Sequence, residues 1–346
     1  MSIDRLAYSD TSIFAEELAR VFGARMYVGS IFDLPTINDY RSLLIGDRAI
    51  TVRNTPDGVR AFNNVCLHRN ALIDPPGIGN RAFRCNYHGW SYGDDGVLKH
   101  APLTNEDSIC ERQLGGYPVS KSGGLFFLGH RNSPDVSDVA LAFDETKSVL
   151  AQPFCRGTLD HACNWKLLVE NVLEGYHLSH VHKDTFVQAG FKSTSDYRYG
   201  MEGGVSWSTM TPKPSDDKSR GYRRITAKAG HHYNHAFVFP NLFLANSNSL
   251  IGFQSSLHPI GVTSTRLEWS LFELPALANL AAPIREHFRK DAIEFANATL
   301  LEDKVMVEAC QLGLSSMGMA CQFQPNEGRI DHFHSMYAEK MGVSPR

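Results

Sequence analysis

Two cysteines and two histidines lie at spacings that could bind metal. Cys66 and His68 are two residues apart; after sixteen intervening residues, Cys85 and His88 follow, three residues apart. Such a set can hold either a tetrahedral zinc ion or a [2Fe–2S] cluster with both histidines on one iron. Structural zinc sites usually pair cysteine with cysteine and histidine with histidine in sequence, whereas each segment here mixes the two. The pattern therefore favours the iron–sulfur cluster.

A second group of candidate ligands lies further along the chain. Glu174 and His177 are three residues apart and share one face of the helix predicted over residues 164–182. His182 is five residues beyond His177, which on a straight helix points roughly 140° away. The helix must therefore end or bend near residue 178 for both histidines to reach one ion. Two histidines and one carboxylate on one face of an octahedral iron leave positions open for O₂ and substrate.

The N-terminal sequence, the apolar runs, the cysteine count and the net charge limit where the protein is expected and what it is expected to bind. The N-terminus has no apolar core followed by a small-residue cleavage site, and no apolar run approaches the roughly 20 residues that span a bilayer. Seven cysteines in such a chain are not expected to form disulfide bonds. The net charge of −3 gives no electrostatic footprint for nucleic acid or for an anionic membrane. We therefore expect a cytoplasmic protein that binds neither.

The first group resembles the Rieske domain. The likeness includes Arg69 after the first histidine and 89–90 (Gly-Trp) after the second, although Leu67 and Asn86 stand where proline is frequent. The resemblance implies one iron bound by the two cysteines and the other by the two histidines. These are Cys66 and Cys85, and His68 and His88.

The second group resembles the catalytic domain of Rieske oxygenases, which carries Asn-x-x-(Asp/Glu)-x-Tyr-His-x₄-His. The matching residues are Asn171, Glu174, Tyr176, His177 and His182. The resemblance implies that the two histidines bind Fe(II) and that Asn171 and Tyr176 belong to the catalytic site. It also makes Glu174 a bridging carboxylate, directed towards a Rieske histidine of a neighbouring subunit.

The third iron ligand is expected to be a distant carboxylate. Residues 301–313 resemble the family's C-terminal helix, and within them we assign Asp303 as the ligand, with Glu302 or Glu308 as the alternatives. His180 is the rival to the two histidines, because a three-residue spacing from His177 suits a helix.

The elements that position these residues indicate an α+β protein. Short β-rich runs between turns predict a small antiparallel β Rieske domain over 38–132. Residues 1–37 and 133–346 form the catalytic mononuclear iron domain, which the resemblance makes a helix-grip (START-like) fold. Strand patterns over 232–272 predict its central antiparallel sheet, and the periodicity of 283–313 predicts its long C-terminal helix.

The resemblance identifies the chain as the catalytic (alpha) subunit of a Rieske non-haem iron oxygenase. It implies one [2Fe–2S] cluster and one Fe(II) per subunit in a head-to-tail homotrimer. A flavin reductase, with or without a ferredoxin, would supply electrons from NAD(P)H. The non-enzyme alternatives are a Rieske electron carrier and a lipid-binding helix-grip module.

The substrate is expected to be a small organic molecule. Glu174, where ring dihydroxylases usually carry Asp, favours the carnitine, choline and betaine-type monooxygenases, which hydroxylate next to nitrogen and often cause N-dealkylation. An aromatic-ring cis-dihydroxylating dioxygenase is the alternative. Six aromatic residues could cage a quaternary ammonium group or simply form the sheet core. They are Trp207, Tyr222, Tyr233, Phe237, Phe239 and Phe243.

Overall fold

The computed structural model describes residues 3–104, 111–129, 136–217, 230–317, 323–324 and 326–343. The chain divides into a small unit, Phe22–Pro134, and a large unit, Met1–Val21 with Asp135–Arg346. The small unit thus begins earlier than the expected residue 38. The reason is that β1 (Met26–Ser30) pairs with β10 (Leu125–Leu128), so the segment before residue 38 joins that unit.

The small unit consists of antiparallel strands. Its five-stranded sheet has the order β5 (Gly77–Asn80), β2 (Asp39–Ile45), β3 (Arg48–Thr55), β4 (Gly58–Asn63) and β8 (Gly116–Tyr117). A three-stranded sheet has the order β1, β10 and β9 (Val119–Ser122), and β6 (Ser91–Tyr92) pairs with β7 (Leu98–His100). Cys66 and Cys85 are buried in the same apolar cluster as Phe62, Phe83 and Trp90. The small unit therefore places both cysteines within its core.

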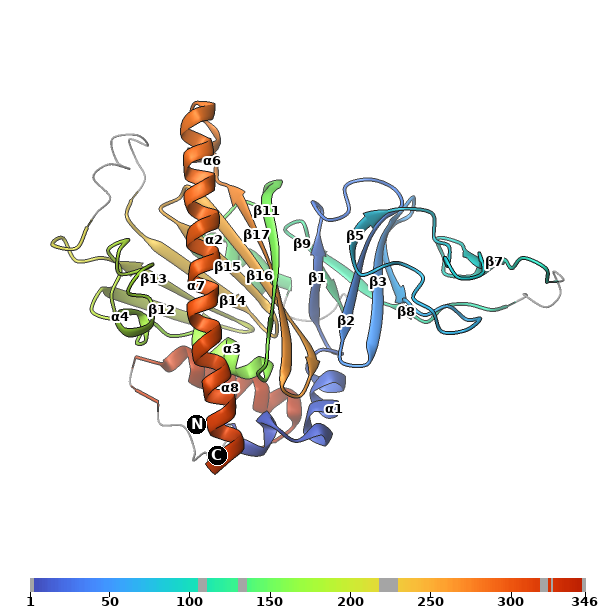
Figure 1. Ribbon diagram of the computed structural model, residues 1–346, viewed down its shortest axis with the longest axis horizontal. Coiled ribbons are helices and arrows are strands. Elements are labelled where there is room, and N and C mark those ends of the chain that lie inside the picture. The colour runs from blue at the N-terminus through green and yellow to red at the C-terminus, as the bar shows by residue number, and fades with distance from the viewer. Residues whose placement is uncertain are drawn as a thin grey trace. The chain divides into compact units, whose positions relative to one another are not determined.

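The large unit is built on a seven-stranded sheet in which every neighbouring pair is antiparallel. Its order is β11 (Pro153–His161), β17 (Ser264–Glu273), β16 (Ile251–Gly261), β15 (Leu242–Ser247), β14 (Tyr233–Val238), β13 (Val205–Thr211) and β12 (Asp196–Glu202). Figure 1 shows the sheet with the long helix α7 (Ala282–Met317) running across it. The prediction of a central antiparallel sheet and a long C-terminal helix is confirmed.

Shorter helices complete the large unit. They are η1 (Arg5–Tyr8), α1 (Thr11–Arg20), α2 (Val136–Thr146), α3 (Trp165–Val172), α4 (Leu178–Val181), α6 (Pro275–Ala278) and α8 (Gly328–Met341). α2 packs against β13, β14 and β15, whereas α3 and α4 contact α7. The single helix expected over 164–182 is therefore two helices, and the break lies at 173–177, earlier than the predicted bend near 178.

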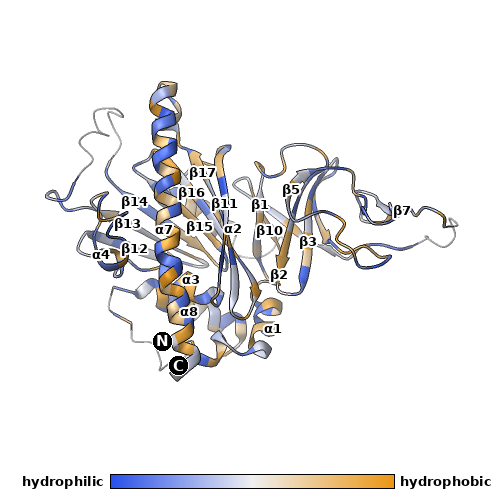
Figure 2. Ribbon diagram, viewed as in Figure 1, coloured by the Kyte–Doolittle hydropathy of each residue, from blue (hydrophilic) through white to orange (hydrophobic). Residues whose placement is uncertain are grey.

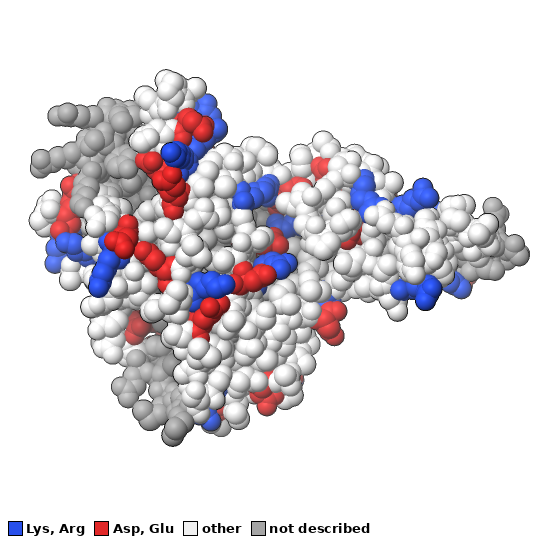
Figure 3. Space-filling model, viewed as in Figure 1, with Lys and Arg blue, Asp and Glu red and all other residues white. Residues whose placement is uncertain are grey.

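Residues of different polarity and charge are mixed on the part of the protein seen in Figures 2 and 3. Figure 2 shows hydrophobic and hydrophilic residues alternating along α7. Lys and Arg lie interspersed with Asp and Glu on the face viewed in Figure 3. On α7, residues four apart form ion pairs, such as Lys290 with Glu294 and Lys304 with Glu308. None of the helices in the described part of the chain is long and apolar enough to cross a membrane.

Candidate metal centres and the adjoining cavity

The two loops that carry the cysteines and histidines of the small unit have the same backbone geometry. In each, the cysteine N–H donates to the carbonyl five residues later, and the cysteine carbonyl accepts from the N–H four residues later, at 2.9–3.0 Å. The residue four positions after each cysteine has a positive φ, 58° at Asn70 and 75° at Gly89. This left-handed backbone conformation is one that glycine adopts readily and that asparagine tolerates better than most residues.

The loops bury the sulfur atoms and expose the imidazoles. Cys66 and Cys85 are each 2% exposed, whereas His68 and His88 are exposed. The Tyr92 hydroxyl donates to Cys66 Sγ at 3.2 Å. Burial raises the pKa of the Cys85 thiol, and the neighbouring Cys66 thiol raises it further. The two thiols are therefore close together in a low-dielectric environment.

The two histidine rings of these loops are also neighbours. The ring centroids of His68 and His88 are 4.5 Å apart, and His68 stacks on Trp90 at 4.8 Å. Desolvation lowers the pKa of His88, with smaller contributions from the positive charges of His68 and Arg69. A low pKa keeps an imidazole neutral, which is the form that binds metal.

The spread of these four ligands fits two metal ions better than one. A single tetrahedral zinc with bonds of about 2.0–2.3 Å would hold all its ligand atoms within about 4 Å of one another. Three or more His, Cys, Asp or Glu side chains approach within 4.8 Å only once in the described ranges, and that group lies in the large unit. Paired thiols on one side and paired imidazoles on the other instead match the ligand set of a Rieske cluster.

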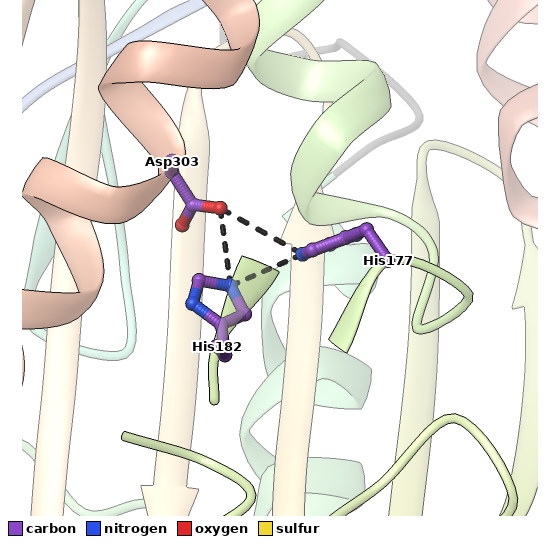
Figure 4. A group of neighbouring side chains, drawn as sticks. All are labelled: His177, His182 and Asp303. Carbon is purple, nitrogen blue, oxygen red and sulfur yellow. Dashed lines mark hydrogen bonds and ion pairs between the residues drawn. The ribbon is translucent and has the colours of Figure 1, made fainter. Parts of the chain in front are cut away.

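That group in the large unit consists of His177, His182 and Asp303 (Figure 4). His182 Nε2 lies 3.1 Å from His177 Nε2 and 3.1 Å from Asp303 Oδ1, and the third side of the triangle is 3.7 Å. With ligand bonds of about 2.1 Å, adjacent corners of an octahedron are about 3 Å apart. The three atoms therefore fit one face of an octahedral metal site.

The break between α3 and α4 is what turns His177 towards this site. One Glu174 carboxylate oxygen accepts from the backbone N–H groups of Tyr176 and His177, the latter at 3.2 Å, which caps the turn. The other carboxylate oxygen contacts His177 Nδ1. Because Nδ1 meets a carboxylate, it carries the proton, and Nε2 is left with its lone pair towards the triangle.

His182 is oriented in the same way from the other side. Glu302 Oε2 lies 2.7 Å from His182 Nδ1 and also accepts from Thr185 Oγ1 at 2.6 Å. Burial lowers the pKa of His182, but its contacts with Asp303 and Glu302 outweigh burial and raise the pKa above its ordinary value. Glu302, considered above as a rival ligand, therefore contacts His182 Nδ1, on the side of the ring away from the triangle. The supporting contact from Thr185 was not predicted.

Asp303 is held by a residue of the sequence motif. Asn171 Nδ2 donates to Asp303 Oδ1 at 2.9 Å, which links α3 to α7. Three other candidates lie apart from the triangle. The Tyr176 side chain is 56% exposed, His180 is exposed, and Glu308 accepts from the Ala162 N–H at 2.8 Å.

The triangle borders a cavity of about 540 Å³ in the large unit. Residues at every second position of the sheet strands line it, for example 243, 245 and 247 on β15. One face of α7 lines it as well, at 288, 291, 292, 295, 296, 299, 300 and 303. Asp303 therefore lies on the same face of α7 as the other residues that line the cavity.

Aromatic side chains surround the metal end of the cavity. Phe186 lies 5.3 Å from the His182 ring, 5.1 Å from Tyr233 and 5.1 Å from Phe295. Of the six aromatic residues singled out in the sequence, Tyr233 and Phe243 line the cavity. Trp207, Phe237 and Phe239 are not among its lining residues, and Tyr222 lies outside the described residues.

Two family descriptions match the chain. The "Ring hydroxylating alpha subunit (catalytic domain)" family matches residues 151–343, more than half of the chain. The "Rieske [2Fe-2S] domain" family matches residues 24–118. These two segments contain all the candidate ligands of the two metal centres.

Named relatives extend the likeness along most of the chain. The carnitine monooxygenase oxygenase subunit of Escherichia coli (strain K12) is 27% identical, covering 96% of this chain and 91% of its own length. The chloroplastic choline monooxygenase of Beta vulgaris is 25% identical, covering 96% of this chain and 76% of its own length.

Solved structures share the fold. A quaternary ammonium Rieske monooxygenase, described in terms of carnitine oxidation and inter-subunit electron transfer, has a TM-score of 0.77 at 19% identity, covering 98% of this chain and 95% of its own. Naphthalene 1,2-dioxygenase from Rhodococcus sp. has a TM-score of 0.76 at 18% identity, and the match covers 99% of this chain and 95% of the dioxygenase chain. Because both kinds of oxygenase match equally well, the fold does not distinguish between their reactions.

Proposed function

The chain belongs to the ring-hydroxylating alpha-subunit family, and from that premise we propose that it hydroxylates a carbon next to nitrogen in a small ammonium substrate. The broader activity, that of a terminal oxygenase with a Rieske cluster and a mononuclear iron, follows from the two family matches. In the proposed reaction, O₂, two electrons and two protons convert an N–CH₃ group to N–CH₂OH, with release of water. The product then collapses to the dealkylated amine, formaldehyde and a proton.

The observation that carries this proposal is the position of the metal triangle at an aromatic end of the cavity. The Phe186 ring lies beside His182 and Tyr233 packs against Phe186, and aromatic faces attract ammonium cations. The carboxylates of Glu174 and Asp303 also line the cavity and add negative charge. A cation is therefore favoured at the end where oxidation takes place.

We assign His177, His182 and Asp303 as the ligands of Fe(II). Iron bound there would supply open coordination positions for O₂ next to the substrate. Asn171 holds Asp303 by a 2.9 Å hydrogen bond, and the carboxylates of Glu174 and Glu302 fix both histidines with Nε2 towards the metal. Such support orients the ligands and raises their basicity.

We assign Cys66 and Cys85 to one iron of the cluster and His68 and His88 to the other. The exposure of both histidines suits a centre that receives electrons from another protein. We propose a flavin reductase as that partner, with or without a ferredoxin, using NAD(P)H. The thiolates require a reducing compartment, for which we propose the cytoplasm.

We further propose a head-to-tail homotrimer in which Glu174 and the neighbouring Tyr176 face the cluster of the next subunit. The 56% exposure of Tyr176 in the single chain supports this arrangement, because the turn that carries Glu174 reaches the surface. One structural relative is described in terms of inter-subunit electron transfer, which is consistent with such an arrangement.

The test is turnover of the iron-replete protein with a reductase under ¹⁸O₂, with products identified by mass spectrometry. Quaternary amines, N-methyl compounds, aromatic acids and neutral arenes form the panel. One labelled oxygen, or loss of an alkyl group from an amine, is the expected result. Two labelled oxygens in one arene product would instead establish the cis-dihydroxylating alternative. The His182→Ala variant serves as the control for chemistry that does not depend on the metal triangle.

A further inference from the structure

A buried arginine lines the same cavity as the metal triangle. Arg329, in the first turn of α8, is 2% exposed. Its guanidinium donates to Ser206 Oγ at 3.2 Å, Ser208 Oγ at 2.9 Å, the Ser206 carbonyl at 3.3 Å and His235 Nδ1 at 3.0 Å. All four acceptors are neutral groups, so they leave the positive charge of Arg329 uncompensated.

Three other buried cations among the described residues are neutralised directly. Arg41, Arg53 and Lys166 each have a carboxylate oxygen at 2.5–2.9 Å. No Asp or Glu among the described residues forms an ion pair with Arg329. A buried, uncompensated charge is costly to the folded protein, and an anion bound in the cavity beside Arg329 would offset that cost.

The histidine bonded to Arg329 supplies a second free donor. Arginine can only donate, so His235 Nδ1 must accept, and the proton of the neutral ring sits on Nε2. Burial and the nearby charge of Arg329 both hold the pKa of His235 well below its ordinary value, which keeps the ring neutral. His235 Nε2 is buried without a hydrogen-bond partner, and the residue lines the cavity.

The donor count leaves room for one ligand group. A guanidinium has five N–H donors, and Arg329 uses four of them in the four bonds above, with one N–H on Nη1 left over. Together with His235 Nε2–H, this makes two donors beside one positive charge. A monoanion with two acceptor oxygens matches this set. A dianion would exceed the charge available, because Glu174, Asp291 and Asp303 also line the cavity.

We propose that Arg329 and His235 form a carboxylate subsite, and that the substrate of this oxygenase carries a carboxylate bound there. The inference rests on the proposed function for the identity of the other end of the substrate. Tyr233 and His235 face the same side of β14, with ring centroids 6.5 Å apart. Tyr233 contacts Phe186, which contacts His182, so aromatic side chains lie between the carboxylate subsite and the metal triangle.

The experiment measures dissociation constants by isothermal titration calorimetry on the holoprotein, without turnover. Two matched pairs of probes differ only in charge at one end: 4-(trimethylammonio)butanoate with its primary amide, and 4-phenylbutanoate with its primary amide. Because a hydrogen bond to a charged group is worth about 1.5–3 kcal/mol, we expect the carboxylate to bind ~10–100-fold more tightly than the amide in the preferred pair. Arg329→Gln should remove this preference, whereas Arg289→Gln should keep it. Arg289 pairs with Glu273 at 2.8 Å and does not line the cavity.

The outcomes separate this inference from the proposed function. A carboxylate preference in the phenyl pair alone would support the subsite and count against an ammonium substrate. Equal binding of carboxylate and amide in both pairs, or an unchanged preference in Arg329→Gln, would overturn the subsite. If Arg329→Gln does not fold, the wild-type comparison still decides. His235→Phe, which keeps a planar ring but removes the Nε2–H donor, should then show a weaker preference.

Discussion

The two metal centres of this chain are built in different ways. The proposed cluster ligands lie on two loops of the same backbone geometry, with the sulfur atoms buried and the imidazoles exposed. The triangle of His177, His182 and Asp303 instead gathers side chains from the α3–α4 turn, the end of α4 and the middle of α7, and borders a cavity. The first candidate centre has exposed histidines, whereas the second borders a cavity that could hold a substrate.

The two candidate centres also differ in the groups that contact their histidine rings. His177 and His182 each have a carboxylate at Nδ1, from Glu174 and Glu302. In the described part of the chain, no hydrogen bond is formed by the ring of His68 or of His88, and the His68 ring stacks on Trp90. If the triangle binds metal as proposed, carboxylate support would orient its histidines and raise their basicity, whereas each proposed cluster histidine would keep a second nitrogen available to a partner.

The largest expected effect comes from removing one corner of the triangle. His182→Ala should lower turnover to background, because two remaining ligands cannot hold Fe(II) in a facial site. Iron analysis should fall from about three to about two atoms per chain, with the visible spectrum of the [2Fe–2S] cluster unchanged. Cys66→Ser is the matched variant, and it should lose the cluster spectrum while keeping the single iron. Loss of both centres in either variant would mean that the two sites are not independent.

The cluster motif was readable from the sequence because it is local. Each loop is closed by hydrogen bonds within five residues of its cysteine, so spacing and residue type are sufficient to indicate the arrangement. The pairing of β1 with β10 was not readable, since it joins segments about one hundred residues apart, and the predicted domain boundary consequently differed.

The triangle was only partly readable. His177 and His182 were apparent from their motif, but the break at 173–177 depends on Glu174 capping the turn, which helical periodicity does not report. The roles of Glu302 and Asp303 depend on how α7 is rotated against the sheet. The α7 residues that line the cavity recur at helical spacing from 288 to 303, and this spacing could have distinguished Asp303 as the ligand from Glu302. Nothing in the sequence near Arg329 indicated that it would be buried without a carboxylate.

The second largest effect should come from the carboxylate behind His182. Glu302→Gln keeps a hydrogen-bond acceptor for Nδ1 but removes the negative charge, so His182 becomes less basic towards the metal. We expect Fe(II) affinity to fall ~10–100-fold, the usual cost of losing such support. Competition with a chelator measures this loss, and the cluster spectrum should not change. Glu308→Gln is the control on the same helix, since Glu308 bonds to the Ala162 N–H away from the triangle. An equal loss in both variants would contradict the role given to Glu302.

A similar loss of iron is expected when the same change is made behind His177. Glu174 uses one carboxylate oxygen for the backbone N–H groups of Tyr176 and His177 and the other for His177 Nδ1, whereas Gln has a single oxygen. Either the turn or the acceptor at Nδ1 is therefore lost in Glu174→Gln, and Fe(II) affinity should fall ~10–100-fold. If Glu174 also connects to the cluster of a neighbouring subunit, single-turnover electron transfer should slow more than iron affinity falls. Normal single-turnover kinetics in an iron-replete variant would remove the bridging role.

The smallest effect should appear at the cluster. Tyr92 donates its hydroxyl hydrogen to Cys66 Sγ, and burial, followed by that contact with Cys66, raises the pKa of the phenol, which keeps the donor protonated. A hydrogen bond to the ligand sulfur stabilises the more negative, reduced cluster, so Tyr92→Phe should lower the reduction potential by tens of millivolts on an order-of-magnitude scale. Protein-film voltammetry measures the shift, and iron content should remain at the wild-type value. Tyr87→Phe is the control, because Tyr87 is 58% exposed and its ring contacts His88 rather than a sulfur atom. A similar shift in both variants would mean that the potential responds to the general surroundings of the loops and not to the bond at Cys66.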